Sequence, residues 1–328
     1  MDKRFVILVT GIGGNVGQGI IRNIRQTGID AFVIGTNVVG FSPGNHLADE
    51  VIVTPFAFDD NYIPMMLNIV DEKKVQLILT ATDYETYYLA ANKERFTCPI
   101  AVSGKEISEI YLDKYLTYLH HNKHQLPFAD TVLPGEVVPN HWKRVIGKPR
   151  KGRGSRGILM DPENPEKLSP EEYMLQEYIE GPEITTAFYV TKEGLLHGHI
   201  TLYRELENGA TISCEVTKEY DIALENIMTR MISKGELRGS VNLQSRVRSN
   251  GDIVPFEVNC RISGTNSIRS QFGFCDVQYL IEEYLLKQKP SAPKIIEGKA
   301  VRILMDVVYP KCKKDDESIN ASTPHLIF

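Results

Sequence analysis

The sequence has few cysteines and no long apolar run. Five of the 328 residues are cysteine, and none stands in a CxxC pair. A disulfide framework or a structural zinc site is therefore not expected, and the predicted compartment is a reducing cytoplasm. No apolar run approaches the ~18–20 residues that a membrane span needs, so no membrane partner is expected.

Positive charge is not in excess either. The chain has 37 Lys and Arg against 42 Asp and Glu, a formal net charge of −5. This balance argues against a broad nucleic-acid-binding face. The length is typical of two or three packed units, and 42% apolar with 24% charged residues is typical of a globular protein.

Short apolar runs alternate with helical patterns over the first ~105 residues. The runs lie at 5–9, 31–35, 51–55 and 75–80, and helices are expected between them. Strands alternating with helices predict an open α/β domain with a parallel sheet.

A glycine-rich turn follows the first of these strands. Gly11, Gly14 and Gly17 could bring backbone N–H groups to a dinucleotide pyrophosphate. Such a site also needs an acid where the second strand ends, but Thr36 and Asn37 stand there. A tight turn with close helix–sheet packing, beside a substrate or without one, is favoured over a nicotinamide oxidoreductase.

The pattern after residue 105 favours antiparallel strands. The turn SNGD between two apolar runs is a strong hairpin signal. The expected elements are helices at 110–124, 223–235 and 276–287, strands at 142–149, 174–190, 194–203, 209–216, 239–248, 253–260 and 300–308, and a loose polar tail. Asp113-Lys114 is expected to open a helix, although this pair alone indicates no function.

Two segments suit a nucleotide. Lys148 ends a strand and leads into the basic, glycine-rich stretch 150–157, which could hold a polyphosphate. A solvated hairpin or an RNA-contacting loop are the alternatives. In the stretch 175–185, the backbone of 177–179 could contact an adenine edge and Glu183 could accept from ribose hydroxyls, unless this is an ordinary turn with two exposed acids.

The hairpin 239–260 carries the strongest signal. Glu257 and Asn259 lie two residues apart and so share a strand face, and Gln244 can lie opposite them. Three oxygen donors of this kind suit Mg²⁺. Arg261 continues the same face, where it could meet a transferring phosphoryl group. Mutually satisfied buried polar residues are the alternative, which the cost of burying such groups disfavours.

Acidic and histidine residues elsewhere carry weaker signals. Asp83 and Glu85 follow the strand at 75–80, where they could bind an amine or cap the next helix. His120, His121 and His124 have a spacing that leaves at most two on one helical face, so surface histidines are favoured over a metal site.

Taken in order, these segments resemble the ATP-grasp superfamily, specifically the branch of the carbamoyl phosphate synthase large subunit and the carboxylate–amine ligases. The resemblance implies an α/β and α+β fold: a Rossmann-like pre-ATP-grasp domain with a parallel sheet (1–110), a small ATP-grasp subdomain with a glycine-rich lid (111–175), a large subdomain with hinge and metal site (176–310), and a polar tail (311–328). Lys114 and Lys148 replace the arginines that are usual in the synthase.

The resemblance also implies roles for individual residues. The implied roles are phosphate contacts by Lys114 and Lys148, a lid with Lys151, Gly152, Gly154 and Ser155, an adenine hinge of Glu177, Tyr178 and Ile179, a ribose acid in Glu183, Mg²⁺ ligands in Gln244, Glu257 and Asn259 with Asn242 nearby, a phosphate-contacting Arg261, and substrate contacts by Asp83, Glu85 and Arg269. Lys148 and Arg261 would be the catalytic cations.

The implied activity is an ATP-dependent ligase. ATP with two Mg²⁺ ions, or Mn²⁺ as a substitute, would phosphorylate a small carboxylate, and an amine would displace the phosphate. A carbamoyl-phosphate-type or kinase-type enzyme that needs a partner subunit is an alternative. A non-catalytic nucleotide-binding protein is another, which the intact set around Glu257 disfavours. A homo-oligomer stays open, because no interface is visible in the sequence.

Overall fold

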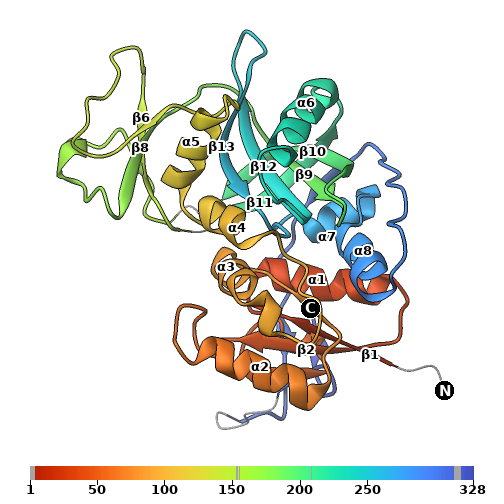
Figure 1. Ribbon diagram of the computed structural model, residues 1–328. Coiled ribbons are helices and arrows are strands. Elements are labelled where there is room, and N and C mark those ends of the chain that lie inside the picture. Colours follow the sequence, from red (N-terminus) through yellow and green to blue (C-terminus); the bar gives the residue numbers. More distant parts are fainter. Residues whose placement is uncertain (1–3, 153, 155, 208, 314–318) are drawn as a thin grey trace.

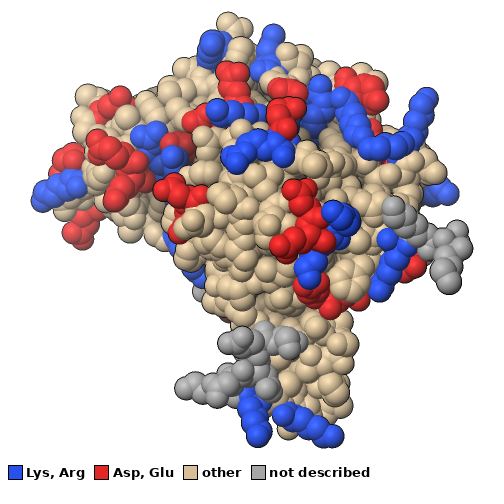
Figure 2. All heavy atoms as spheres, turned by 60° about the horizontal axis from the view of Figure 1, so that its bottom comes forward, with Lys and Arg blue, Asp and Glu red and all other residues tan. Residues whose placement is uncertain are grey.

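The computed structural model describes residues 4–152, 154, 156–207, 209–313 and 319–328. In these residues it has three larger sheets and one two-stranded sheet. The N-terminal domain lies at the bottom of Figure 1. Above it lie a small and a large sheet from the part of the chain after residue 110, which together are called the clamp. The small sheet stands to one side and the large sheet across the top. On the face in Figure 2, basic and acidic side chains are intermixed.

The N-terminal sheet is parallel, as predicted, in the order β3-β2-β1-β4. Its elements are β1 (Phe5–Val9), α1 (Asn15–Gln26), β2 (Ala31–Asn37), β3 (Glu50–Val53), α2 (Tyr62–Lys73), β4 (Leu77–Leu79) and α3 (Asp83–Ala91). The side chains of β4 are fully buried, as expected for a strand covered on both faces. The strand order reverses between β1 and β4, and open α/β sheets bind ligands at such a point.

Two helices join this domain to the clamp, where one was predicted at 110–124. They are α4 (Lys105–Leu112) and α5 (Lys114–Lys123). The chain turns extended at Asp113, whose carboxylate accepts from the backbone N–H groups of Tyr115 and Leu116 and so caps α5. The expected helix start at Asp113-Lys114 is confirmed.

Both clamp sheets are antiparallel, as predicted. The small sheet has the order β5-β8-β6-β7, and the large sheet has the order β13-β12-β9-β10-β11-β14. The strands are β5 (Thr131–Val132), β6 (Val145–Pro149), β7 (Leu159–Met160), β8 (Tyr173–Glu177), β9 (Glu183–Val190), β10 (Leu196–Glu207), β11 (Ala210–Thr217), β12 (Gly239–Val247), β13 (Ile253–Asn259) and β14 (Lys299–Val301). β8 runs across the predicted border at 175–176, and the subdomain borders themselves stay predictions.

Short helices complete the clamp. They are α6 (Asp221–Ile232), whose Leu224, Met228 and Met231 pack into the core of the large sheet, α7 (Asn266–Arg269), α8 (Asp276–Leu280) with a π-helical turn at Ile281–Leu285, and the 3₁₀ turns Pro165–Lys167 and Ser270–Phe272. Two further 3₁₀ turns, Asn45–Leu47 and Lys93–Arg95, lie in the N-terminal domain. No helix in the described part of the chain is long and apolar enough to span a membrane.

The end of the chain returns to the N-terminal domain. One strand was predicted at 300–308, but the structure has two short strands there, β14 and β15 (Val307–Val308). β15 pairs with β16 (Leu326–Ile327) near the end of the chain. The Asn45 side chain donates to the Ile319 carbonyl at 3.0 Å, and the Ala321 N–H donates to the Ala48 carbonyl at 2.8 Å. The expectation of a loose tail is therefore wrong for residues 319–328.

Candidate active site

A cleft of about 1280 Å³ lies between the N-terminal domain and the two clamp sheets. Its walls come from the carboxyl ends of the parallel strands, from the small sheet and from one face of the large sheet. It contains nearly every residue that the sequence singled out: Asp83, Glu85, Lys114, Lys148, Lys151, Gly152, Gly154, Glu177, Tyr178, Ile179, Glu183, Asn242, Gln244, Glu257, Asn259 and Arg261. Ser155 lies outside the described residues.

The hairpin of β12 and β13 forms the floor of this cleft. The SNGD turn joins the two strands as predicted and begins the pairing with Val247 opposite Ile253. A register shift between Gln244 and Ser245 then pairs Gln244 with Glu257 and Asn242 with Asn259. The Gln244 amide donates to Asn259 Oδ1 at 3.3 Å, and Asn259 Nδ2 donates to Glu257 Oε1 at 3.3 Å. The predicted oxygen donors therefore lie together, and their role as metal ligands stays a prediction.

Buried charges of both signs meet beside this trio. Burial alone would raise the pKa of the Glu257 carboxyl, but Lys114 and Lys148 outweigh it and lower that pKa below its usual value. Burial lowers the pKa of the Lys148 ammonium to about 8, although Glu257 opposes the shift. Lys148 Nζ donates to Gln176 Oε1 at 2.6 Å and lies 4.6 Å from the centre of the Phe256 ring. Glu257 is thus ionised at neutral pH.

The glycine-rich stretch lies against two parts of the clamp. Lys114 Nζ donates to the Gly152 carbonyl at 3.2 Å, and the Lys114 N–H donates to the Arg150 carbonyl at 2.9 Å. The backbone of Gly154 lies against Gly209, in the turn between β10 and β11, where a Cβ would stand 2.5 Å from the Gly154 oxygen. A side chain at Gly209 would therefore push the two segments apart.

Tyr178 is held at the join of the two clamp sheets. The guanidinium carbons of Arg144 and Arg246 each lie 4.9 Å from the centre of its ring. Arg248 makes an ion pair of 2.7 Å with the neighbouring Glu177 carboxylate. The N–H of Ile179 has no backbone partner among the residues that the structure describes, so it can serve a ligand in the cleft.

Arginines that sequence reasoning missed surround Glu183. Arg204 makes an ion pair of 2.6 Å with Glu183 and also contacts the Gln244 side chain, and Arg246 lies 3.5 Å from Glu183. Arg246 stands two residues after Gln244 on the same strand, so the period of two could have flagged it. Arg204 reaches the site only through the pairing of β9 with β10.

Asp83 connects the N-terminal domain with the hairpin of β12 and β13. Its carboxylate accepts from Arg261 Nη2 at 2.7 Å and from Asn259 Nδ2 at 3.4 Å. Burial would lower the pKa of the Arg261 guanidinium, but the Asp83 carboxylate raises it above its usual value. The cap of α3 is Thr82 rather than either acid, because the Thr82 hydroxyl accepts from the backbone N–H of Glu85 at 3.2 Å. The predicted substrate contacts of both acids stay predictions.

The glycine turn is required by close packing. A Cβ at Gly17 would stand 2.6 Å from the Gly11 oxygen, and one at Gly13 would stand 2.8 Å from the Asn37 side chain. Gly11 itself has a φ of +60°, which favours glycine. These contacts support the packing interpretation of the turn.

Comparison with protein families identifies two consecutive segments of the chain. Residues 7–102 match the family described as the PylC-like N-terminal domain, and residues 111–265 match the ATP-grasp domain. The chain belongs to the ATP-grasp superfamily. The search of curated proteins returned no match.

Solved structures of other ATP-grasp proteins share this fold. N5-carboxyaminoimidazole synthetase from Staphylococcus aureus, complexed with ADP, is 13% identical with a TM-score of 0.75, over 92% of this chain and 83% of that one. L-amino acid ligase from Bacillus licheniformis is 14% identical with a TM-score of 0.70, over 89% and 76% of the two chains. The biotin carboxylase domain of the Hydrogenobacter thermophilus 2-oxoglutarate carboxylase is 14% identical with a TM-score of 0.66, over 88% and 72%. At these identities the likeness shows the fold.

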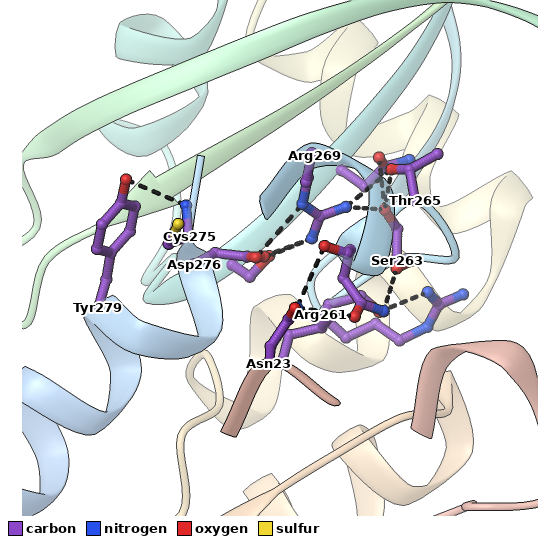
Figure 3. A network of polar contacts seen from close by, with 12 residues as sticks. Asn23, Arg261, Ser263, Thr265, Arg269, Cys275, Asp276 and Tyr279 are labelled. Atoms are coloured by element: carbon purple, nitrogen blue, oxygen red, sulfur yellow. Dashed lines mark hydrogen bonds and ion pairs between the residues drawn. The ribbon is translucent and has the colours of Figure 1, made fainter. Parts of the chain in front are cut away.

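Arg269 does not face the cleft of this ATP-grasp protein, so its predicted substrate contact is corrected. The side chain is fully buried and makes an ion pair with Asp276. Its Nη1 donates to the hydroxyls of Ser263 at 2.6 Å and Thr265 at 2.9 Å (Figure 3). Because Ser263 and Thr265 line the cleft, Arg269 supports the wall from behind.

The histidines of the ATP-grasp protein's α5 are not all surface residues. His121 is fully buried, and His120 is nearly so. His121 Nδ1 lies 3.1 Å from the Pro127 carbonyl, and burial lowers the pKa of its imidazole to about 4. Sequence periodicity missed this because α5 packs between α4 and β13. Among the described residues, no group of three or more His, Cys, Asp or Glu side chains could hold a metal ion.

Proposed function

We propose that this protein is an ATP-dependent ligase that joins a small carboxylate to an amine and releases ADP and phosphate. One observation carries the proposal: the half-buried, ionised Glu257 lies among Lys114, Lys148 and Arg261 in the cleft between the N-terminal domain and the two clamp sheets. Phosphoryl transfer is catalysed mainly by positioning and charge stabilisation, and this set supplies both. The ATP-grasp family and its ligase neighbours support the same class.

The donors beside Glu257 fit Mg²⁺. A carboxylate with two amide side chains offers the hard oxygen ligands that this ion prefers, and Glu257 is deprotonated as a ligand must be. Gln244, Glu257 and Asn259 would hold the ion. When bound, it would neutralise charge on the ATP phosphates. Arg204 donates to the Gln244 side-chain oxygen and would have to release this oxygen before it could bind the ion.

The remaining residues have roles that follow from their charge and place. Lys114 and Lys148 would bind the phosphates, the lid around Gly152 would exclude water, and Arg261 would stabilise the transferring phosphoryl group. A carboxylate oxygen attacks the γ-phosphorus, and the bond to ADP breaks. The amine nitrogen then attacks the acyl carbon of the acyl phosphate. The carbon–oxygen bond to phosphate breaks, and the amine proton passes to solvent.

ADP formation tests the proposed function. Purified protein with Mg·ATP is screened against pools of small carboxylates and amines, with Glu257→Gln as the blank. We expect ADP above the blank only when a productive carboxylate is present, and an amide product when the amine is added. Nucleotide binding without ADP formation in any pool would contradict a ligase, and a surviving phosphorylated product would indicate a kinase-type enzyme.

Lys148 predicts a pH dependence of nucleotide affinity. Its ammonium has a pKa of about 8 in the protein without nucleotide, and phosphate binding favours the protonated form. Below pH 8 the charge is present, and above it each pH unit is expected to weaken ADP binding by up to ~10-fold until the pKa of the complex is reached. Calorimetric titration from pH 7 to 9.5 measures this. Lys148→Arg should flatten the profile, and an equal slope in both proteins would contradict the assignment.

A further inference from the structure

The two sides of the cleft differ in the sign of their charge. The residues from 4–110 that line it include two charged side chains, Asp83 and Glu85, both acidic. Within the described lining, every cation comes from the ATP-grasp domain: Lys114, Lys148, Lys151, Arg156, Arg204, Arg246 and Arg261. The cleft therefore suits an anion on the clamp side and a cation on the N-terminal side.

Aromatic side chains line the acidic side. The Phe56 and Phe58 rings, in the loop after β3, stack with centres 5.3 Å apart and planes 4° apart. Tyr84 meets Phe58 edge-on at 6.0 Å. Phe56 is 51% exposed and Phe58 58% exposed, although both line a cleft. Exposed apolar surface of this kind marks a binding site, and aromatic faces attract cations.

Glu85 is fixed beside these rings by the fold. Its Oε2 accepts from the Thr10 hydroxyl at 2.8 Å and from the Thr82 hydroxyl at 2.7 Å. A Cβ at Gly11 would stand 3.2 Å from the same oxygen, so the carboxylate lies against the turn between β1 and α1. The two hydroxyls are neutral donors, and they orient the carboxylate at the point where the strand order reverses.

We propose that the amine substrate of this ligase binds here as a primary ammonium ion on an apolar, aromatic body, and that it carries no phosphate. This inference rests on the proposed function. The ammonium group would lie at Glu85, and its body would lie against Phe56, Phe58 and Tyr84. Asp83 is already paired with Arg261 at 2.7 Å, so the carboxylate that a phosphorylated substrate would meet here is Glu85, which repels it.

A matched pair of ligands tests the inference. Phenethylamine and 2-phenylethyl phosphate share one aromatic body and differ in the sign of the head group, whereas ethylamine lacks the body. Each is titrated calorimetrically into the full chain saturated with Mg·ADP, so that no turnover occurs. We expect phenethylamine to bind at least ~10-fold more tightly than either other compound.

Substitutions in the aromatic wall complete the test. Phe58→Arg places a cation on an exposed surface and should weaken phenethylamine binding at least ~10-fold. Phe41→Arg is the control, because Phe41 is 65% exposed, packs on Tyr309 and lies outside the cleft lining. The inference would be overturned if 2-phenylethyl phosphate bound as tightly as phenethylamine or more tightly, or if phenethylamine bound equally well to Phe58→Arg and Phe41→Arg. Either result would leave the proposed function standing. Failure of the unmodified chain to bind Mg·ADP would overturn the proposed function and the inference with it.

Discussion

Replacing Glu257 by glutamine is expected to reduce ADP formation by ~10³-fold or more, because this position carries the negative charge of the proposed metal trio. Gln244 and Asn259 supply neutral amide oxygens, which alone bind Mg²⁺ weakly. The substitution also leaves Lys114, Lys148 and Arg261 without the half-buried carboxylate that lies among them. Glutamine keeps the shape and can still accept from Asn259 Nδ2.

The measurement is ADP formation at saturating substrates, with thermal unfolding as the test of folding. Glu215→Gln is the matched control: Glu215 lies on β11 of the same sheet, is half-exposed and pairs with Lys299 at 3.0 Å. We expect the control to retain full activity. Ordinary turnover by folded Glu257→Gln would refute the metal assignment.

Replacing Arg261 by lysine is expected to lower kcat by ~10²-fold or more, with a smaller change in the KM for ATP. The planar guanidinium donates to Asp83 at 2.7 Å and to the Ile262 carbonyl at 3.0 Å. A lysine keeps the charge but has no fork that can make both contacts. The charge would then be held less firmly where negative charge develops in the transition state.

Steady-state kinetics of Arg261→Lys and Arg261→Ala separate charge from geometry. If both variants lose kcat to the same degree, the fork geometry matters; if lysine retains activity, charge alone suffices. Arg25→Lys is the control, since Arg25 pairs with Asp49 on the surface of α1. A rise in KM with unchanged kcat would contradict a role in phosphoryl transfer.

The hairpin of β12 and β13 could be predicted because its main signals are local. A two-residue period places Glu257 and Asn259 on one face, and the SNGD turn predicts the hairpin itself. The register shift between Gln244 and Ser245, which brings Gln244 opposite Glu257, has no such local signal. The same holds for the parallel sheet, whose buried strands are continuous apolar runs. Local propensity and hydrophobic pattern agree there, so few alternative structures compete.

The contacts that link distant segments could not be predicted. The ion pair of Asp83 with Arg261 joins residues that are 178 positions apart. Neither residue signals the other, because their meeting depends on how the N-terminal domain packs on the clamp. Arg269 shows the converse. A basic residue after a polar loop suggests a ligand contact, but Asp276 neutralises it within the core.

Asp113 lies on the connection between the two sides of the cleft. Its carboxylate begins α5 and pairs at 2.8 Å with Arg150, at the root of the glycine-rich stretch. The preceding helix α4 packs beside α3, which begins with Asp83. We therefore expect a ligand that shifts α3 to act on the same connection as a nucleotide that the glycine-rich stretch would cover. By linkage, any factor by which nucleotide strengthens amine binding is also the factor by which the amine strengthens nucleotide binding.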